Sequence, residues 1–63
     1  MLVEGWRSGA KTIEATTAIK KHTSLSLKDA KKLVERVLEG EVVELPNDFV
    51  LREDLHDAGF IIR

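Results

Sequence analysis

The sequence predicts an α+β domain in which three helices pack on a small three-stranded sheet, in the order (β)-α-α-β-α-β. Apolar residues recur with a helical period in the middle of the chain and near its end, and each such segment lies between a capping residue and a glycine. Stretches rich in β-branched or aromatic residues, 41–45 and 60–63, follow these two segments. With 63 residues, the chain has room for a single domain, residues 1–63.

The first strand is the least regular of the predicted elements. Leu2, Val3 and Trp6 could form a short strand, but Gly5 interrupts it and the alternation is imperfect. We expect Trp6, the only tryptophan, to anchor the core or its edge, because a small domain needs large apolar side chains. Ser8-Gly9 is then typical of a turn.

The first helix is predicted over residues 10–22. Small and branched residues gather on one of its faces: Ala10, Ile13, Ala15, Ala18 and Ile19. Either Ser8 or Thr12 could be its N-cap. Lys20 and Lys21 occupy the last turn, where cations interact favourably with the helix dipole.

The second helix carries the strongest local signal. Ser26 and Asp29 have the spacing of a capping box, in which each side chain accepts from the other residue's amide. One apolar stripe follows, made of Ala30, Leu33, Val34, Val37 and Leu38, and Gly40 stands where a left-handed C-cap is expected. Another face is basic and comprises Lys28, Lys32 and Arg36, with Lys31 nearby. The pattern predicts an amphipathic helix of about three turns.

The C-terminal third predicts a strand, a helix and a strand. Residues 41–45 are rich in β-branched side chains, and Pro46 closes the stretch. A third helix begins at Asn47 or Asp48 and continues to Ala58, with Leu51 and Leu55 on its apolar side. Gly59 ends this helix, and residues 60–63 form the last strand, whose exposed edge could pair two copies.

Composition narrows the class of protein. The chain has no cysteine, which excludes disulfides and thiolate metal sites, and no run approaches the roughly 20 apolar residues that span a bilayer. We therefore expect a cytoplasmic protein without a membrane-bound state. Residues 1–36 carry eight Lys or Arg and four Asp or Glu, whereas residues 37–63 carry two and seven. This asymmetry predicts either solvated faces that keep the domain soluble or a basic patch that meets an acidic partner.

Two segments resemble a known family. The run from Thr23 to Glu35, TSLSLKDAKKLVE, is similar to the T-G-L-G-L-K-E-A-K-x-L-V-E run of the C-terminal domain of the bacterial ribosomal stalk protein. The ending Leu55-His56-Asp57-Ala58-Gly59, followed by a short strand, matches a second segment of that domain. The resemblance covers roughly residues 10–63. It implies the same α+β fold and a role in contacting translational GTPases, without cofactor or catalysis.

The resemblance also implies a contact surface on the first two helices. Carried over by position, Lys20 and Lys31 match basic contact residues of the family, Ile13 matches an apolar one, and Lys28 keeps the neighbouring lysine. The chain departs from the family at four positions: serines replace both glycines of the run, at Ser24 and Ser26, and Thr16 and Thr17 replace an apolar residue and a lysine. The family's dimerisation region and hinge are also absent from this sequence, so we expect a stand-alone relative, and a phage or accessory origin would be consistent with that.

Two other functions remain as alternatives. Residues 18–32 also look like the opening of histone-like HU-type proteins, which implies nucleic-acid binding through a helix-turn-helix-like pair. The sequence pI of about 6.1 weighs against it. An enzyme is disfavoured because no nucleophile or phosphate-loop motif is present. His22 is expected to be a cap or surface residue, and Glu53 and His56 have a metal-ligand spacing without the second motif that such a site requires.

Overall fold

The central strand of the sheet is the first one in the chain. The computed structural model describes all of residues 1–63 and has the predicted order: β1 (Leu2–Trp6), α1 (Thr12–His22), α2 (Leu27–Leu38), β2 (Val43–Glu44), α3 (Phe49–Asp57) and β3 (Phe60–Ile62). The strands are arranged β2-β1-β3, and both pairings are antiparallel. The α+β prediction is therefore confirmed.

The irregularity predicted at Gly5 is a feature of the sheet. Between Val3 and Gly5 the pairing of β1 with β3 shifts register, so that Val3 opposes Ile62 and Gly5 opposes Ile61. A residue inserted on one strand in this way is a β-bulge, and it twists and bends the strand locally. Strand β1 therefore continues through Gly5 and pairs with both of its neighbours.

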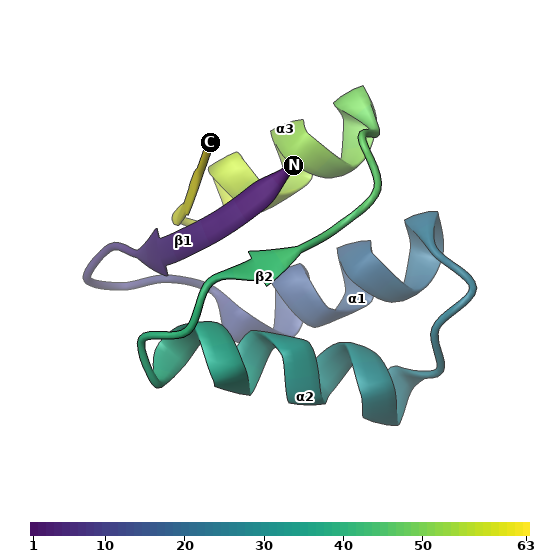
Figure 1. Cartoon of the computed structure of the whole chain (residues 1–63), viewed down its shortest axis with the longest axis horizontal. Coiled ribbons are helices and arrows are strands. Elements are labelled where there is room, and N and C mark those ends of the chain that lie inside the picture. The colour runs from purple at the N-terminus through teal and green to yellow at the C-terminus, as the bar shows by residue number, and fades with distance from the viewer.

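The molecule has two layers, a sheet and a set of helices; in Figure 1 the strands β1 and β2 lie in front of α1 and α3, and α2 lies below them. Helices α2 and α3 pack against the strands, and α1 packs against both of these helices. The core lies between the layers and is made of 13 buried apolar residues: Val3, Ala15, Ala18, Ile19, Ala30, Val34, Val37, Val43, Leu45, Leu51, Leu55, Ala58 and Phe60. Because α1 lies farthest from the sheet, its outer face is open to solvent.

Both predicted N-caps of the first helix are wrong. Helix α1 begins at Thr12 rather than at residue 10, and Lys11 stands at its N-cap position without a side-chain hydrogen bond. The reason is a tertiary contact: the amide of Lys11 donates to the carbonyl of Ala58 at 2.7 Å. An amide that would otherwise require a capping side chain is thus satisfied by the end of α3.

Helix α2 begins and ends where the sequence predicts. The amide of Asp29 donates to Ser26 Oγ at 3.2 Å, but the Ser26 amide does not donate to the Asp29 carboxylate, so only one of the two capping-box bonds forms. Gly40 has a φ of +96° and closes the helix. Of the apolar stripe, Ala30, Val34 and Val37 are buried, and the other two residues are partly buried.

We expect Ser26→Ala to lower the free energy of unfolding by about 1 kcal/mol, because the Asp29 amide loses its acceptor. Urea unfolding followed by circular dichroism measures the change. The matched control is Ser24→Ala, since Ser24 is exposed and makes no side-chain hydrogen bond. Equal losses for the two variants would contradict the capping role.

The C-terminal elements refine the prediction. Asp48, and not Asn47, is the N-cap of α3: its Oδ1 accepts from the Leu51 amide at 3.1 Å. Asn47 Oδ1 accepts instead from the amino group of Met1 at 2.8 Å. Strand β2 is shorter than the predicted 41–45 stretch, because only Val43 and Glu44 find partners on β1.

The prediction that Trp6 anchors the core or its edge is wrong. Its side chain is 45% exposed and does not belong to the core or to the apolar residues packed against it. Trp6 lies opposite Phe60 in the register of β1 and β3. Phe60, which is 2% exposed, fills the core at this end of the sheet.

Candidate functional site

A groove lies between the first two helices, which residues 23–26 join into a hairpin. Its volume is about 280 Å³. The residues that line it come from both helices: Thr12, Ile13, Thr16 and Thr17 from α1, and Leu27, Lys31, Val34, Glu35 and Leu38 from α2. We call this feature the α1–α2 groove.

The α1–α2 groove has a buried floor and an exposed apolar rim. Val34 and Thr16 are 3% and 8% exposed, whereas Ile13 and Leu27 are 81% and 54% exposed. The Thr16 hydroxyl donates to the Thr12 carbonyl at 2.8 Å, so its polar atom is satisfied inside α1. An apolar side chain on the surface of a partner could therefore enter the groove without leaving this hydroxyl unpaired.

The predicted contact residues divide into two pairs. Ile13 and Lys31 line the groove together, whereas Lys20 and Lys28 do not line it. Both of those lysines are exposed, in the last turn of α1 and the first turn of α2. Sequence reasoning missed Leu27 on the rim; its spacing of four from Lys31 places both on one face of α2 and is the signal that could have found it.

The placement of Ile13 corrects the predicted apolar face of α1. The buried residues of this helix are Ala15, Thr16, Ala18 and Ile19. Ile13 is a large apolar residue left almost fully in water, on the side of α1 that no other element covers. The packing role that the helical pattern predicts for Ile13 is therefore wrong.

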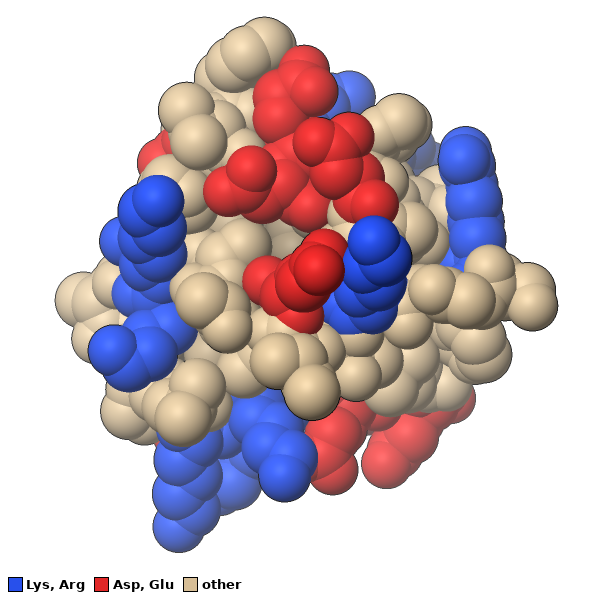
Figure 2. All heavy atoms as spheres, turned by 180° about the vertical axis from the view of Figure 1, so that it is seen from behind, with Lys and Arg blue, Asp and Glu red and all other residues tan.

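The lysines of this face are free of intramolecular ion pairs. The ion pairs of the chain involve either a histidine or one of two arginines, Arg36 and Arg63. Figure 2 shows the helical layer: Asp and Glu side chains gather in its upper part, where α3 lies, and Lys and Arg side chains lie along its left side and at the lower left. The ammonium groups of Lys20, Lys28 and Lys31 are thus available to an acidic group outside the chain.

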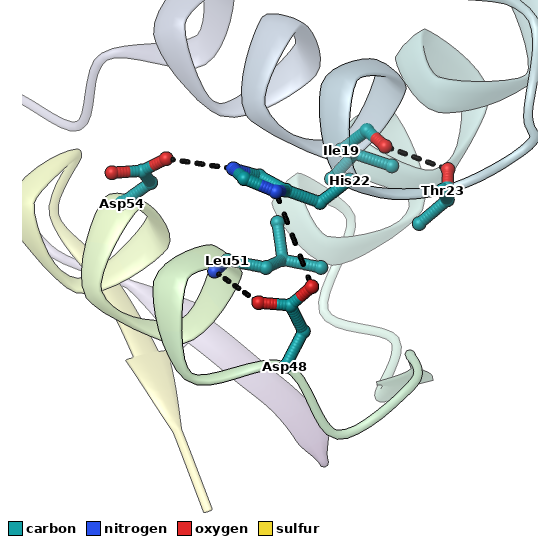
Figure 3. A network of polar contacts seen from close by, with 6 residues as sticks. All are labelled: Ile19, His22, Thr23, Asp48, Leu51 and Asp54. Atoms are coloured by element: carbon teal, nitrogen blue, oxygen red, sulfur yellow. Dashed lines mark hydrogen bonds and ion pairs between the residues drawn. The ribbon is translucent and has the colours of Figure 1, made fainter.

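His22 connects the end of α1 to α3 (Figure 3). Its Nε2 lies 3.2 Å from Asp54 Oδ2, and its Nδ1 lies 4.0 Å from Asp48 Oδ2. A carboxylate only accepts, so the shorter bond requires the proton on Nε2. The side chain is 15% exposed, so His22 is an interhelical link rather than the cap or surface residue predicted. The link fixes the last turn of α1, which also carries Lys20.

We expect His22→Ala to lower the free energy of unfolding by about 1 to 2 kcal/mol, because a half-buried hydrogen bond to a charged group is lost. Urea unfolding gives the change, and amide shifts at the end of α1 and the start of α3 locate it. His56→Ala is the control, since that side chain is 63% exposed and should change stability by less than about 0.5 kcal/mol. A loss as large for His56 would show that His22 is not a specific link.

The other candidate sites have little geometry to support them. No group of three or more His, Asp or Glu side chains is placed to hold a metal ion. Glu53 and His56 line a hollow of about 190 Å³ with Arg52 and Ile62. None of the three helices is both long enough and apolar enough to cross a membrane. The α1–α2 groove is therefore the strongest candidate.

No family model, curated protein or solved structure matches the chain.

Proposed function

We propose that this chain is a non-enzymatic protein-interaction module that docks the face of α1 and α2 on an acidic partner surface. The observation that carries the proposal is the α1–α2 groove, where the 81% exposed Ile13 and the unpaired Lys31 lie on opposite sides of one apolar hollow. Exposed apolar side chains beside free cations are typical of a surface that binds an acidic partner with an apolar contact at its centre.

The size of the groove limits the strength of binding. A groove of about 280 Å³ accepts one or two side chains of a partner rather than a whole domain. Interfaces of this kind are small, with modest affinity, and the lysines around them act chiefly by steering the encounter. We therefore expect binding that weakens as the ionic strength rises.

The partner that we propose is a translational GTPase or another component of translation in the cytoplasm. Support comes from the likeness of residues 23–35 to the stalk protein run, since that family contacts GTPases through its first two helices. Thr16 and Thr17 replace an apolar residue and a lysine of that family, so the groove of this chain has less apolar area and less charge. We expect a weaker contact than the family makes.

The test is an amide NMR titration of the ¹⁵N-labelled protein with a translational GTPase at physiological salt. Shifts should concentrate on the groove residues and on Lys20 and Lys28. Ile13→Ser and Lys31→Glu should each weaken binding about tenfold, because the first removes the central apolar contact and the second reverses the steering charge. Lys32→Glu is the matched control: it makes the same charge change on the same helix, but Lys32 does not line the groove.

A parallel titration with duplex DNA tests the alternative function, which is nucleic-acid binding. Salt-sensitive shifts with DNA alone would replace the GTPase by a nucleic acid as the partner. Shifts with the GTPase that lie outside α1 and α2 would contradict the proposed face. If neither ligand shifts any amide, both named partners are wrong.

A further inference from the structure

Ile13 stands on a ridge between two grooves. Besides the α1–α2 groove, it lines a second groove of about 450 Å³ on the other side of α1, between that helix and α3. The lining residues of this second, α1–α3 groove are Ile13, Glu14, Thr17, Ala18, Lys21, Asp54 and Asp57. Ile13 and Thr17 therefore form an exposed ridge along α1, with one groove on each flank.

One flank of the ridge has an excess of carboxylates, and the other has lysines without an intramolecular ion pair. The α1–α3 groove has three carboxylates, on Glu14, Asp54 and Asp57, against one lysine. On the other flank, Lys31 lies in the α1–α2 groove beside Glu35, and Lys28 precedes Lys31 by about one turn of α2. No ion pair within the chain joins the lysines of α2 to the acids of α3. The free lysines of one flank are thus available to the carboxylates of the other flank on a second copy.

We propose that two copies of this chain associate face to face through the Ile13 ridge, with a two-fold axis running along α1. A rotation of 180° about this axis keeps the direction of α1 and exchanges the sides on which α2 and α3 lie. The α3 flank of each copy therefore faces the α2 flank of the other. Lys31 of each copy then approaches the acidic groove of its partner, and the two Ile13 side chains meet at the centre. An axis across α1 would instead oppose α3 to α3, which places carboxylates against carboxylates.

The size of the molecule makes this dimer a weak one. A standard interface of about 800 Å² per partner would take about a fifth of the 4159 Å² surface of the chain, so a single ridge with its grooves lies at the low end of interface sizes. We expect a concentration-dependent dimer that salt dissociates. The dimer covers the α1–α2 groove, so it competes with the partner; this last point alone rests on the proposed function.

Sedimentation of the protein alone tests the dimer without any partner. At low salt, from about 10 µM to about 1 mM, the apparent mass should rise from the 7.1 kDa of the monomer toward twice that value, and about 0.5 M salt should reverse the rise. A mass that stays at the monomer value up to about 1 mM at low salt would overturn the proposal. That outcome would leave the partner-binding proposal standing, since sedimentation of the protein alone involves no partner.

A charge exchange tests the geometry. Lys31→Glu and Asp57→Lys should each weaken the dimer about fivefold to tenfold, because each contact occurs twice in a two-fold dimer. The double variant restores opposite charges across the interface and should recover the association. Asp57 is suitable because its side chain is 78% exposed. Lys32→Glu should leave the dimer unchanged. A double variant weaker than both singles, or a Lys32 effect equal to that of Lys31, would show that the flanks do not face each other.

Discussion

Phe60→Ala is expected to remove most or all of the stability of the protein at room temperature. Phe60 is 2% exposed and is one of the three largest side chains that are completely enclosed by the core. Truncating such a phenylalanine costs about 3 to 5 kcal/mol, because the lost burial and the cavity left behind add together. A chain of this length has only about 3 to 9 kcal/mol of stability in all. Thermal unfolding by circular dichroism should show a loss of the cooperative transition or a large fall in Tm.

The only other phenylalanine provides the matched control. Phe49 lies in the first turn of α3 and is 74% exposed. Phe49→Ala makes the same chemical change and should alter the free energy of unfolding by less than about 0.5 kcal/mol. Comparable effects for the two variants would mean that the core does not lie between the helices and the sheet as described. Phe60→Leu, which keeps most of the volume, should retain a cooperative transition.

Gly59→Ala is expected to lower the free energy of unfolding by about 2 to 4 kcal/mol. Gly59 has a φ of +93°, which side chains adopt at a cost, and a Cβ atom built on it would lie 3.1 Å from the Cα of Ala10. This neighbour is backbone and cannot turn aside. In the same turn the Ala58 carbonyl accepts from the Lys11 amide at 2.7 Å, so strain at Gly59 reaches the start of α1.

Gly40→Ala separates the two contributions to the loss expected at Gly59, which are the cost of a positive φ and the close approach to Ala10. Gly40 has nearly the same φ, +96°, but a Cβ there would meet nothing within 4 Å. This variant should therefore lose only the conformational part, about 1 kcal/mol. The difference between the two substitutions in urea unfolding measures the close approach to Ala10. If both variants lost the same free energy, the contact between the α3–β3 turn and the start of α1 would be absent in solution.

The sequence predicted only part of the lining of the candidate site. Ile13 and Lys31 were predicted by position, and they line one groove. Lys20 and Lys28 were predicted with them, but they stand at the ends of their helices, beyond the groove. Helical spacing alone cannot separate the two pairs, because which exposed residues share a hollow depends on how α1 and α2 pack.

The sequence by itself determined the features that depend on neighbours within about one turn. The cap of α2 at Ser26, the apolar stripe that follows it and the glycine stop at Gly40 all lie within single segments, and they stand as predicted. Asp48 was one of two candidates for the cap of α3, and its hydrogen bond to Leu51 is equally local. Interactions of this kind need no knowledge of the rest of the chain.

Only the tertiary structure decided where the long-range contacts fall. Helix α1 starts at Thr12 because the Lys11 amide bonds to Ala58, 47 positions later in the chain. Trp6 is exposed whereas Phe60, its partner in the register of the sheet, is buried, and His22 hydrogen-bonds with Asp54 of α3. Ile13 is exposed because α2 and α3 pack on the other sides of α1. The start of α1 and the exposure of these side chains depend on which distant segments pack together. The spacing of residues within one segment does not contain that information.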